Sequence, residues 1–547
     1  MTWREKWTVF RAWFTRRGID PLVTLAYAGG VALFLMVLSQ FYIPGKGFSY
    51  LIAFGGNLEE VRLSKVRKMD YYIQRSSSGY DAQYYVQIAM DPSLQNTQLK
   101  QAVDNLAYRA RRILFPATAF LLGGASPPAI LQAYALQNAF CWLVLAVLLL
   151  HWFPPRDWDC FMRWIGVLFS LGVSVSVRNA LVDGPSLLLI ALGLFLADKG
   201  RPWWSTLVLA VSGLGKETNL LGAASLLPKR GADFKTWMLA IIRGALVAAP
   251  LVLWLLYLSL KLGPVMDAGQ RNFDWPFVAY LHKWRQVMGE LPDVGWPNFG
   301  ALWSFFMLIT LTVQFLFLVL RPQWDRAWWR VGMSFAVLMI VLGDAVWEGY
   351  PGAASRVLLP MQLAFNILVP MGRWWRLVLL AGNLTLVAAF FELQPPAIEG
   401  YVMGGNSSLF STASGRAMTM QYTTGWYSPE GFRSFFWCWA RGNAEHKIFN
   451  PHSFIVKGRL RFSTFAAGHR TLHLKLNGEE IWQTTMGDNQ LITASLSALR
   501  LLPGENLLEW QTDMPSVQVN SDPRALAFVL QNLRLDVLRE LPAEPAP

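Results

Sequence analysis

The sequence predicts a polytopic α-helical membrane domain followed by a smaller, all-β domain of the jelly-roll or sandwich type. Of the 547 residues, 54% are hydrophobic and only 15% are charged, which is too apolar for a soluble protein of this size. Near residue 394 the long apolar runs give way to short segments rich in Gly, Ser, Thr and Asn. We therefore expect a transmembrane domain over residues 1–394 and a β domain over residues 395–547.

Apolar segments long enough to cross a bilayer recur along the first domain. Crossing about 30 Å of hydrocarbon takes roughly 20 helical residues, and a helix satisfies its own backbone polar groups there. The clearest spans are expected at residues 21–43, 129–152, 163–182, 237–260, 299–320, 331–347, 356–371 and 376–394. Residues 185–197 predict a shorter span, and residues 113–124, which contain Pro116, predict either a re-entrant or an interfacial segment.

The Lys and Arg residues of the short loops set the expected orientation. A cluster of basic residues precedes the first span, so the amino terminus is expected in the cytoplasm and the loop 44–112 outside it. The later basic loops alternate correctly only if residues 203–228 form a hairpin of two half-length helices, with Lys216 at its outer tip. A single crossing there would reverse every later loop. The hairpin gives about eleven crossings and an external carboxyl terminus.

The formal net charge of +13 does not indicate a nucleic-acid partner. Acidic and basic residues nearly balance after residue 394, so the excess lies in the membrane domain, largely in loops expected to face the cytoplasm. The three cysteines, Cys141, Cys160 and Cys438, form neither a disulfide framework nor a metal-ligand cluster. No glycine-rich phosphate-binding motif follows a predicted strand, so the use of a nucleotide sugar is not supported.

The terminal domain contains short segments in which apolar and polar residues alternate. The clearest are residues 459–465, 471–478, 479–485, 506–512 and 526–538. Turn signals such as Asn477-Gly478 and Pro503-Gly504 separate them, and several short strands at this spacing predict a β-sandwich of the jelly-roll type. The Trp-rich segment 425–445 could bind carbohydrate by stacking on sugar rings, or could pack the core or rest on the membrane; both interpretations are open.

The most informative motif is GYDAQYYVQIA, over residues 79–89 in the first loop. It predicts a short helix from Asp81 to Asp91, because Pro92 disfavours helical geometry in the residue before it. An aspartate at a helix amino terminus is favoured by free backbone donors and the helix dipole, so Asp81 could simply be an N-cap. Tyr80 and Tyr84 fall on one helix face, where tyrosines commonly anchor a protein at the membrane interface.

A basic run follows in YRARRILFP, over residues 108–116. Arginine side chains bind phosphate oxygens in a bidentate manner, and more strongly where water is scarce. In a helix Arg109 and Arg112 share a face while Arg111 points elsewhere. Arg109 and Arg112 are therefore the preferred phosphate ligands, and contact with lipid headgroups is the alternative.

Further ionisable residues are expected on the same outer side of the membrane. They form three neighbouring pairs: Arg178 with Asp183, Lys216 with Glu217, and Glu348 with Arg356. Polar groups at membrane depth are costly unless they are paired or line a cavity. For each pair, mutual neutralisation and substrate binding therefore both remain open.

These features together resemble those of bacterial GT-C superfamily glycosyltransferases, which are integral membrane enzymes that use polyprenyl-phosphate sugars. The resemblance is sharpest over Gly79–Tyr85 and Tyr108–Pro116. In that family an acidic residue of the first external loop is the catalytic base, and Asp81 matches it. Many members have paired acids there, whereas this chain has no adjacent second carboxylate; the weaker candidates are Asp70, Asp91 and Asp104.

The resemblance implies an inverting glycosyltransferase of a bacterial inner membrane, with its active site and β domain outside the cytoplasm. The donor would be a polyprenyl-phosphate sugar, and the acceptor a cell-envelope glycan, lipid or protein. The candidate ligands of the donor phosphate are Arg109, Arg112, Lys216, Arg178 and Arg356. The candidate substrate contacts are Tyr80, Gln83, Tyr84, Asp183, Glu217 and Glu348.

No metal cofactor is required in principle, because arginine and lysine can meet the charge of the leaving phosphate, although a divalent cation is compatible with this chemistry. Membrane lipid is expected around the helices. The alternative function is a transporter or flippase of lipid-linked saccharides, in which the intramembrane charges would line a permeation path. The long first loop with its isolated acid favours the enzyme.

Overall fold

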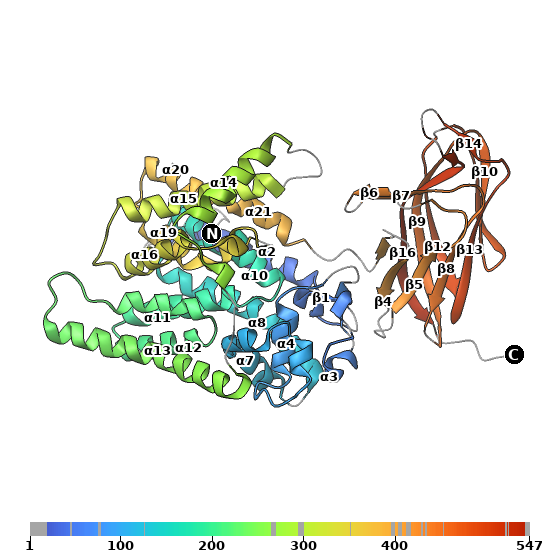
Figure 1. The fold of residues 1–547 in the computed structure, drawn as a ribbon. Coiled ribbons are helices and arrows are strands. Elements are labelled where there is room, and N and C mark those ends of the chain that lie inside the picture. The colour runs from blue at the N-terminus through green and yellow to red at the C-terminus, as the bar shows by residue number, and fades with distance from the viewer. Residues whose placement is uncertain are drawn as a thin grey trace, which may run out of the picture.

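The computed structural model contains an α-helical domain followed by a β domain (Figure 1). It describes residues 19–43, 46–58, 60–69, 71–74, 78–124, 126–263, 270–293, 300–349, 352–394, 400–402, 407–411, 417–427, 430–432, 435–451, 453–488, 490–519, 522 and 524–541. The basic cluster before the first span and Asp70 lie outside the described residues.

Four helices are long and apolar enough to cross a membrane, and each matches a predicted span. They are α2 (Pro21–Ser39), α8 (Pro127–Leu148, extended by η4, Leu149–His151), α13 (Phe234–Leu262) and α15 (Gly300–Leu320). Helix α2 begins with proline at its first position, where the Asp20 carboxylate accepts hydrogen bonds from the N–H groups of Leu22 and Val23. Its Phe34 ring stacks on Trp142 of α8 in the buried core of the bundle.

Two further predicted spans are bent helix pairs. Helices α9 (Trp158–Leu168) and α10 (Leu171–Arg178) meet at 44°, and α20 (Arg373–Ala381) and α21 (Thr385–Glu392) meet at 46°. Distant side chains satisfy backbone carbonyls near both bends, because Gln362 donates to the oxygen of Gly166 and Gln314 donates to that of Gly382. The described residues thus hold four such helices, or six spans if each pair counts as one, and the predicted crossing number stays a prediction.

Shorter helices complete the bundle. They are α11 (Asp183–Asp198), α12 (Pro202–Gly213), η5 (Glu217–Leu226), α14 (Val278–Glu290), η7 (Leu291–Asp293), α16 (Ala327–Ile340), α17 (Asp344–Trp347), α18 (Ala353–Val357) and α19 (Leu359–Leu368). Helix α12 packs against the 3₁₀ helix η5, and a Cβ atom on Gly222 would lie 3.2 Å from the Leu209 side chain. The chain therefore reverses at Lys216, as the hairpin interpretation of residues 203–228 predicts.

The loop between α2 and α8 folds into small elements around a hydrophobic core of its own. These are η1 (Ser49–Ile52), β1 (Phe54–Gly55), η2 (Gly56–Leu58), α3 (Ser64–Arg67), β2 (Ile73–Gln74), α4 (Ala82–Ala89), α5 (Leu99–Ala102), α6 (Leu106–Arg109), η3 (Ala110–Arg112) and α7 (Leu114–Gly123). Strands β1 and β2 pair in parallel. Gly79 has φ +72°, and a Cβ atom there would lie 2.5 Å from the Ala53 oxygen, so only glycine fits this turn before α4.

The described residues of the β domain form two six-stranded sheets and one two-stranded sheet, β14-β15. Its strands are β3 (Gly400–Val402), β4 (Ser407–Ser411), β5 (Ala417–Tyr422), β6 (Glu430–Phe432), β7 (Phe435–Trp439), β8 (Ala444–Asn450), β9 (Ile455–Ala466), β10 (Arg470–Leu476), β11 (Glu479–Met486), β12 (Ile492–Leu501), β13 (Gly504–Thr512), β14 (Val517–Gln518), β15 (Ala525–Leu526) and β16 (Phe528–Leu541). The strand orders are β11-β10-β13-β8-β5-β4 and β12-β9-β16-β7-β6, with β3 beside β16.

The strand order of the two sheets is that of a jelly roll. Strands β7, β16, β9 and β12 lie in one sheet and β8, β13, β10 and β11 in the other, so successive strands mostly alternate between sheets and form two Greek keys. The predicted jelly-roll sandwich is therefore confirmed. Trp426, from the Trp-rich segment, contacts His446 and Phe528 in the core, so for this residue the packing interpretation is correct.

Candidate functional site

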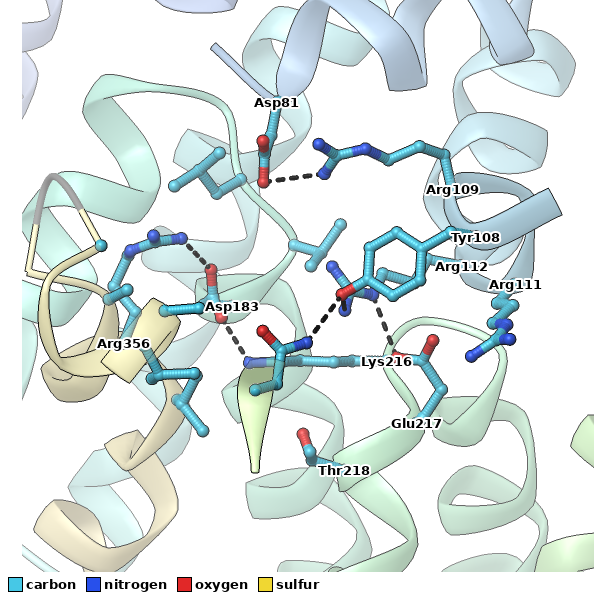
Figure 2. Close-up of a pocket in the computed structure, with 18 of the residues that line it drawn as sticks. Asp81, Tyr108, Arg109, Arg111, Arg112, Asp183, Lys216, Glu217, Thr218 and Arg356 are labelled. Carbon is cyan, nitrogen blue, oxygen red and sulfur yellow. Dashed lines mark hydrogen bonds and ion pairs between the residues drawn. The ribbon is translucent and has the colours of Figure 1, made fainter. Parts of the chain in front are cut away.

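A cavity of about 480 Å³ lies where the first loop meets the hairpin tip and the chain after α16 (Figure 2). This volume is within the range of small-molecule sites, about 300–1,000 Å³. It brings together eight of the predicted site residues: Tyr80, Asp81, Arg109, Arg112, Asp183, Lys216, Glu217 and Arg356. These residues come from the first loop and from three later segments of the chain, so the fold brings together residues that are far apart in the sequence.

Asp81 lies at the edge of this cavity, in the turn before α4. Its side chain makes no capping hydrogen bond to the helix, so the interpretation of Asp81 as a simple N-cap is wrong. Instead the carboxylate Oδ2 lies 3.0 Å from Nη1 of Arg109, and the side chain is 30% exposed. Within the described part of the chain, Arg109 is its one ion-pair partner.

Arg109 is held between two carboxylates. Its Nε and Nη2 donate to Asp104 at 3.0 and 2.8 Å, while Nη1 faces Asp81. Its guanidinium carbon lies 5.1 Å from the ring centroid of Tyr84, a cation–π contact made outside the cavity. Asp104, a weaker candidate for the acid, is therefore a residue that orients Arg109.

Arg112 pairs with the hairpin tip. Its Nε donates to Oε2 of Glu217 at 3.0 Å, and its two terminal nitrogens donate to the hydroxyls of Tyr85 and Tyr108 at 2.9 and 3.2 Å. The expectation that Glu217 could neutralise Lys216 is therefore wrong. Lys216 immediately precedes the helix η5 and Glu217 is its first residue, so the two side chains point in different directions and each contacts a partner from another segment.

Asp183 binds two cations at the opposite side of the cavity, as Figure 2 shows. Lys216 donates to its Oδ1 at 2.5 Å and Arg356 to its Oδ2 at 3.0 Å, and all three side chains are buried. Arg356 also donates to the hydroxyl of Tyr80 at 2.8 Å. Burial raises the pKa of Tyr80 to about 12, so this phenol is neutral at physiological pH.

Four predicted site residues lie outside the cavity lining. Tyr84 packs on Arg109, as described above. Gln83 is buried and joins two backbone segments, since it accepts from the Gly55 N–H and donates to the Ser78 oxygen. The Arg178 guanidinium lies 4.3 Å from the ring centroid of Tyr50, away from Asp183. Glu348 is exposed at the end of α17 and does not pair with Arg356.

The structure excludes the three pairings that proximity in the sequence left open. These were Arg178 with Asp183, Lys216 with Glu217, and Glu348 with Arg356. Asp183 instead pairs with Lys216 and Arg356, and Glu217 pairs with Arg112. The physical reason is that tertiary packing brings η3, the hairpin tip and α18 to the start of α11.

Sequence reasoning missed several cavity residues. The polar ones are Tyr85, Tyr108, Arg111, Thr218 and Asn272, and an apolar wall contains Leu181, Val182, Phe273, Leu338, Leu342, Val346 and Val357. Tyr85 follows Asp81 by four residues and could have been found from helical spacing. No sequence pattern marked Asn272 as a site residue. It lies on η6 (Gln270–Asn272), and its backbone oxygen accepts a hydrogen bond from the Gly343 N–H at 2.7 Å.

Both charged and apolar side chains line the cavity. Five cationic side chains, Arg109, Arg111, Arg112, Lys216 and Arg356, face three carboxylates, Asp81, Asp183 and Glu217. The arrangement suits an anion joined to an apolar group. Within the residues that the structure describes, no group of three or more His, Cys, Asp or Glu side chains could hold a metal ion.

Comparison with known proteins gives only distant likenesses. No protein-family model and no curated protein matches the sequence. Arabinosyltransferase EmbB from Mycobacterium smegmatis is similar at 10% identity over 96% of this chain and 65% of its own, with a TM-score of 0.35. A family two carbohydrate esterase from Clostridium thermocellum, in complex with cellohexaose, is similar at 11% identity over 23% of this chain and 34% of its own, with a TM-score of 0.15. Both TM-scores are too low to establish a shared fold.

Proposed function

We propose that this protein is an inverting glycosyltransferase that moves a sugar from a polyprenyl-phosphate donor to an acceptor outside the cytoplasm. The observation that supports this most directly is the meeting of a partly exposed carboxylate, Asp81, with a cationic wall in one cavity. Glycosyl transfer from a lipid phosphate needs these two parts: a base for the acceptor hydroxyl and cations for the departing phosphate.

Asp81 is the proposed general base. As the acceptor oxygen bonds to the anomeric carbon, the bond from that carbon to the phosphate oxygen breaks, and the phosphate leaves with the electron pair. The hydroxyl proton passes to Asp81. Attack on the face opposite the phosphate inverts the anomeric configuration. Nη1 of Arg109 orients the carboxylate, and the bidentate contact with Asp104 orients Arg109 in turn.

The cationic wall is proposed to stabilise the charge that grows on the phosphate. A donor phosphodiester carries one negative charge, and the released monoester carries up to two, so a cation near it favours the transition state over the bound donor. The apolar wall around Leu338, Leu342 and Val357 suits the first isoprene units next to that phosphate. The membrane orientation expected from the loop charges puts this cavity and the β domain outside the cytoplasm.

Asp81→Asn tests the base directly. The amide preserves the shape of the side chain but cannot accept the proton, so turnover should be lost while donor binding stays close to normal. Asp104→Asn is the matched control, because Asp104 shares the same arginine partner but does not line the cavity. The control should retain measurable transfer.

The measurement is transfer of radiolabel from a series of polyprenyl-phosphate sugars to cell-envelope extract by the purified full-length protein. Comparable transfer by the wild-type protein and Asp81→Asn would exclude Asp81 as the base. Movement of intact lipid-linked sugar across vesicles without any transfer would identify a flippase instead.

A further inference from the structure

Arg111 differs from the other cationic side chains of the cavity in having no carboxylate partner. Arg109 pairs with Asp81 and Asp104, Arg112 with Glu217, and both Lys216 and Arg356 with Asp183. For Arg111, the described chain supplies no ion pair, and its buried Nε has no hydrogen-bond partner. An arginine has five N–H donors, and a buried donor without a partner is costly.

Arg111 lies just after the boundary between two short helices. Helix α6 ends at Arg109, and the chain continues as the 3₁₀ helix η3, which contains Arg111. The guanidinium carbon of Arg111 lies 5.6 Å from the ring centroid of Tyr108 in α6. The hydroxyl of the same tyrosine accepts from Arg112.

Two neighbouring segments fix η3 in place. Trp254 of α13 donates its indole N–H to the Ala110 oxygen at 2.8 Å, and the Leu114 N–H donates to the Leu214 oxygen at 3.1 Å. The second bond joins the first residue of α7, two residues after the end of η3, to the hairpin that holds Lys216. Arg111 is thus a cation on a fixed backbone that lines the cavity.

We propose that Arg111 binds the phosphate of the lipid-linked donor and of the released polyprenyl phosphate. This inference rests on the proposed function and assigns the phosphate contact within the same site. Movement of Arg109 or Arg112 to a ligand would break the described ion pairs of Asp81 and Asp104 or of Glu217, and movement of Lys216 or Arg356 would leave Asp183 with one cation in place of two. Arg111 can engage two phosphate oxygens with its planar fork and leaves no carboxylate unpaired.

The same phosphate-ester chemistry is present in membrane lipid headgroups, so the experiment separates the two sources. Undecaprenyl phosphate is titrated into the full-length protein, purified in a neutral detergent and again in phosphatidylcholine nanodiscs. The variants are Arg111→Ala, Arg111→Lys and Arg67→Ala, the last an exposed arginine of the same loop outside the cavity. Thermal unfolding of each variant is recorded beside the binding.

Arg111→Ala should weaken undecaprenyl phosphate binding by about 10- to 100-fold in both media, the loss expected for hydrogen bonds between charged groups. Arg111→Lys should recover part of the affinity, since the charge remains while the bidentate geometry is lost. Arg67→Ala should bind as the wild-type protein does. All three should unfold near the wild-type temperature, because no carboxylate loses its partner.

Unchanged affinity in Arg111→Ala, with the wild-type protein still binding and transferring sugar, would overturn the assignment of Arg111 and leave the proposed function intact. Native mass spectra of the detergent-purified wild-type protein and Arg111→Ala, recorded after addition of phosphatidylglycerol, test the headgroup source. Loss of bound phosphatidylglycerol in Arg111→Ala, with undecaprenyl phosphate binding unchanged, would identify Arg111 as a headgroup contact and overturn the inference too. A wild-type protein that binds undecaprenyl phosphate through Arg111 but transfers no sugar would contradict the proposed function alone.

Discussion

Asp183 neutralises two buried cations, so its replacement by asparagine should destabilise the helical domain strongly. The carboxylate is only 4% exposed, and it binds Lys216 through one oxygen and Arg356 through the other. Asparagine keeps the size of the side chain but removes the charge. Its single amide oxygen can serve one cation, and the amide nitrogen then faces the other.

The expected loss is large because of this burial. Removing one partner of a buried ion pair costs about 3–5 kcal/mol, since an uncompensated charge remains away from water. The matched control is Asp198→Asn at the other end of the same helix, where the carboxylate is 40% exposed and lies near His151. An exposed pair contributes about 0–1 kcal/mol, so this variant should differ little from the wild-type protein.

The assay is thermal unfolding of the full-length protein in detergent, followed by tryptophan fluorescence for both variants. A second variant, Asp183→Asn with Lys216→Met, removes one of the two unpaired charges and should recover part of the loss. If Asp183→Asn and Asp198→Asn lower the unfolding temperature equally, the carboxylate does not hold the cations together as argued.

Two further predictions concern other regions. Burial lowers the pKa of His446 to about 3. Below pH 6.5 the unfolded chain therefore binds a proton at this histidine that the folded chain does not bind. The free energy of unfolding should fall by about 1.4 kcal/mol for each pH unit below 6.5. The protection factors of β8 peptides in hydrogen exchange should therefore decrease from pH 7 to pH 5, and His446→Gln should remove this pH dependence. An equal pH dependence of the protection factors in both proteins would contradict the prediction. In a cysteine-free background, new cysteines at Asn57 and Ser516 should react with an impermeant thiol reagent from outside, and one at Asp325 only after permeabilisation. External labelling at Asp325 would reverse the orientation.

The secondary structure was largely predictable because it depends on local periodicity. Runs of about 20 apolar residues predict α2, α8, α13 and α15, and period-two alternation predicts the jelly roll. The bends were not predictable, since the side chains that satisfy the backbone there come from far along the chain. Gln362, for example, serves Gly166 across 196 positions.

The site residues were also predictable in kind but not in their pairing. Residue type and expected membrane side were enough to select Asp183, Lys216 and Arg356. Their mutual contacts depend on packing between segments up to 173 positions apart, which no local pattern encodes. Arg111 was assigned away from the site because helical spacing was assumed, whereas the chain changes there to a 3₁₀ helix.

The pairing pattern distinguishes the two aspartates that line the cavity, Asp81 and Asp183. A general base must accept a proton in the transition state, and a carboxylate held by two cations favours its ionised form. Asp183 is held in that way and is buried. Asp81 is partly exposed and meets one nitrogen of Arg109, whose other donors are directed at Asp104. Asp81 can therefore take up a proton without leaving a cation unpaired, because Arg109 keeps Asp104, whereas protonation of Asp183 would leave both Lys216 and Arg356 uncompensated.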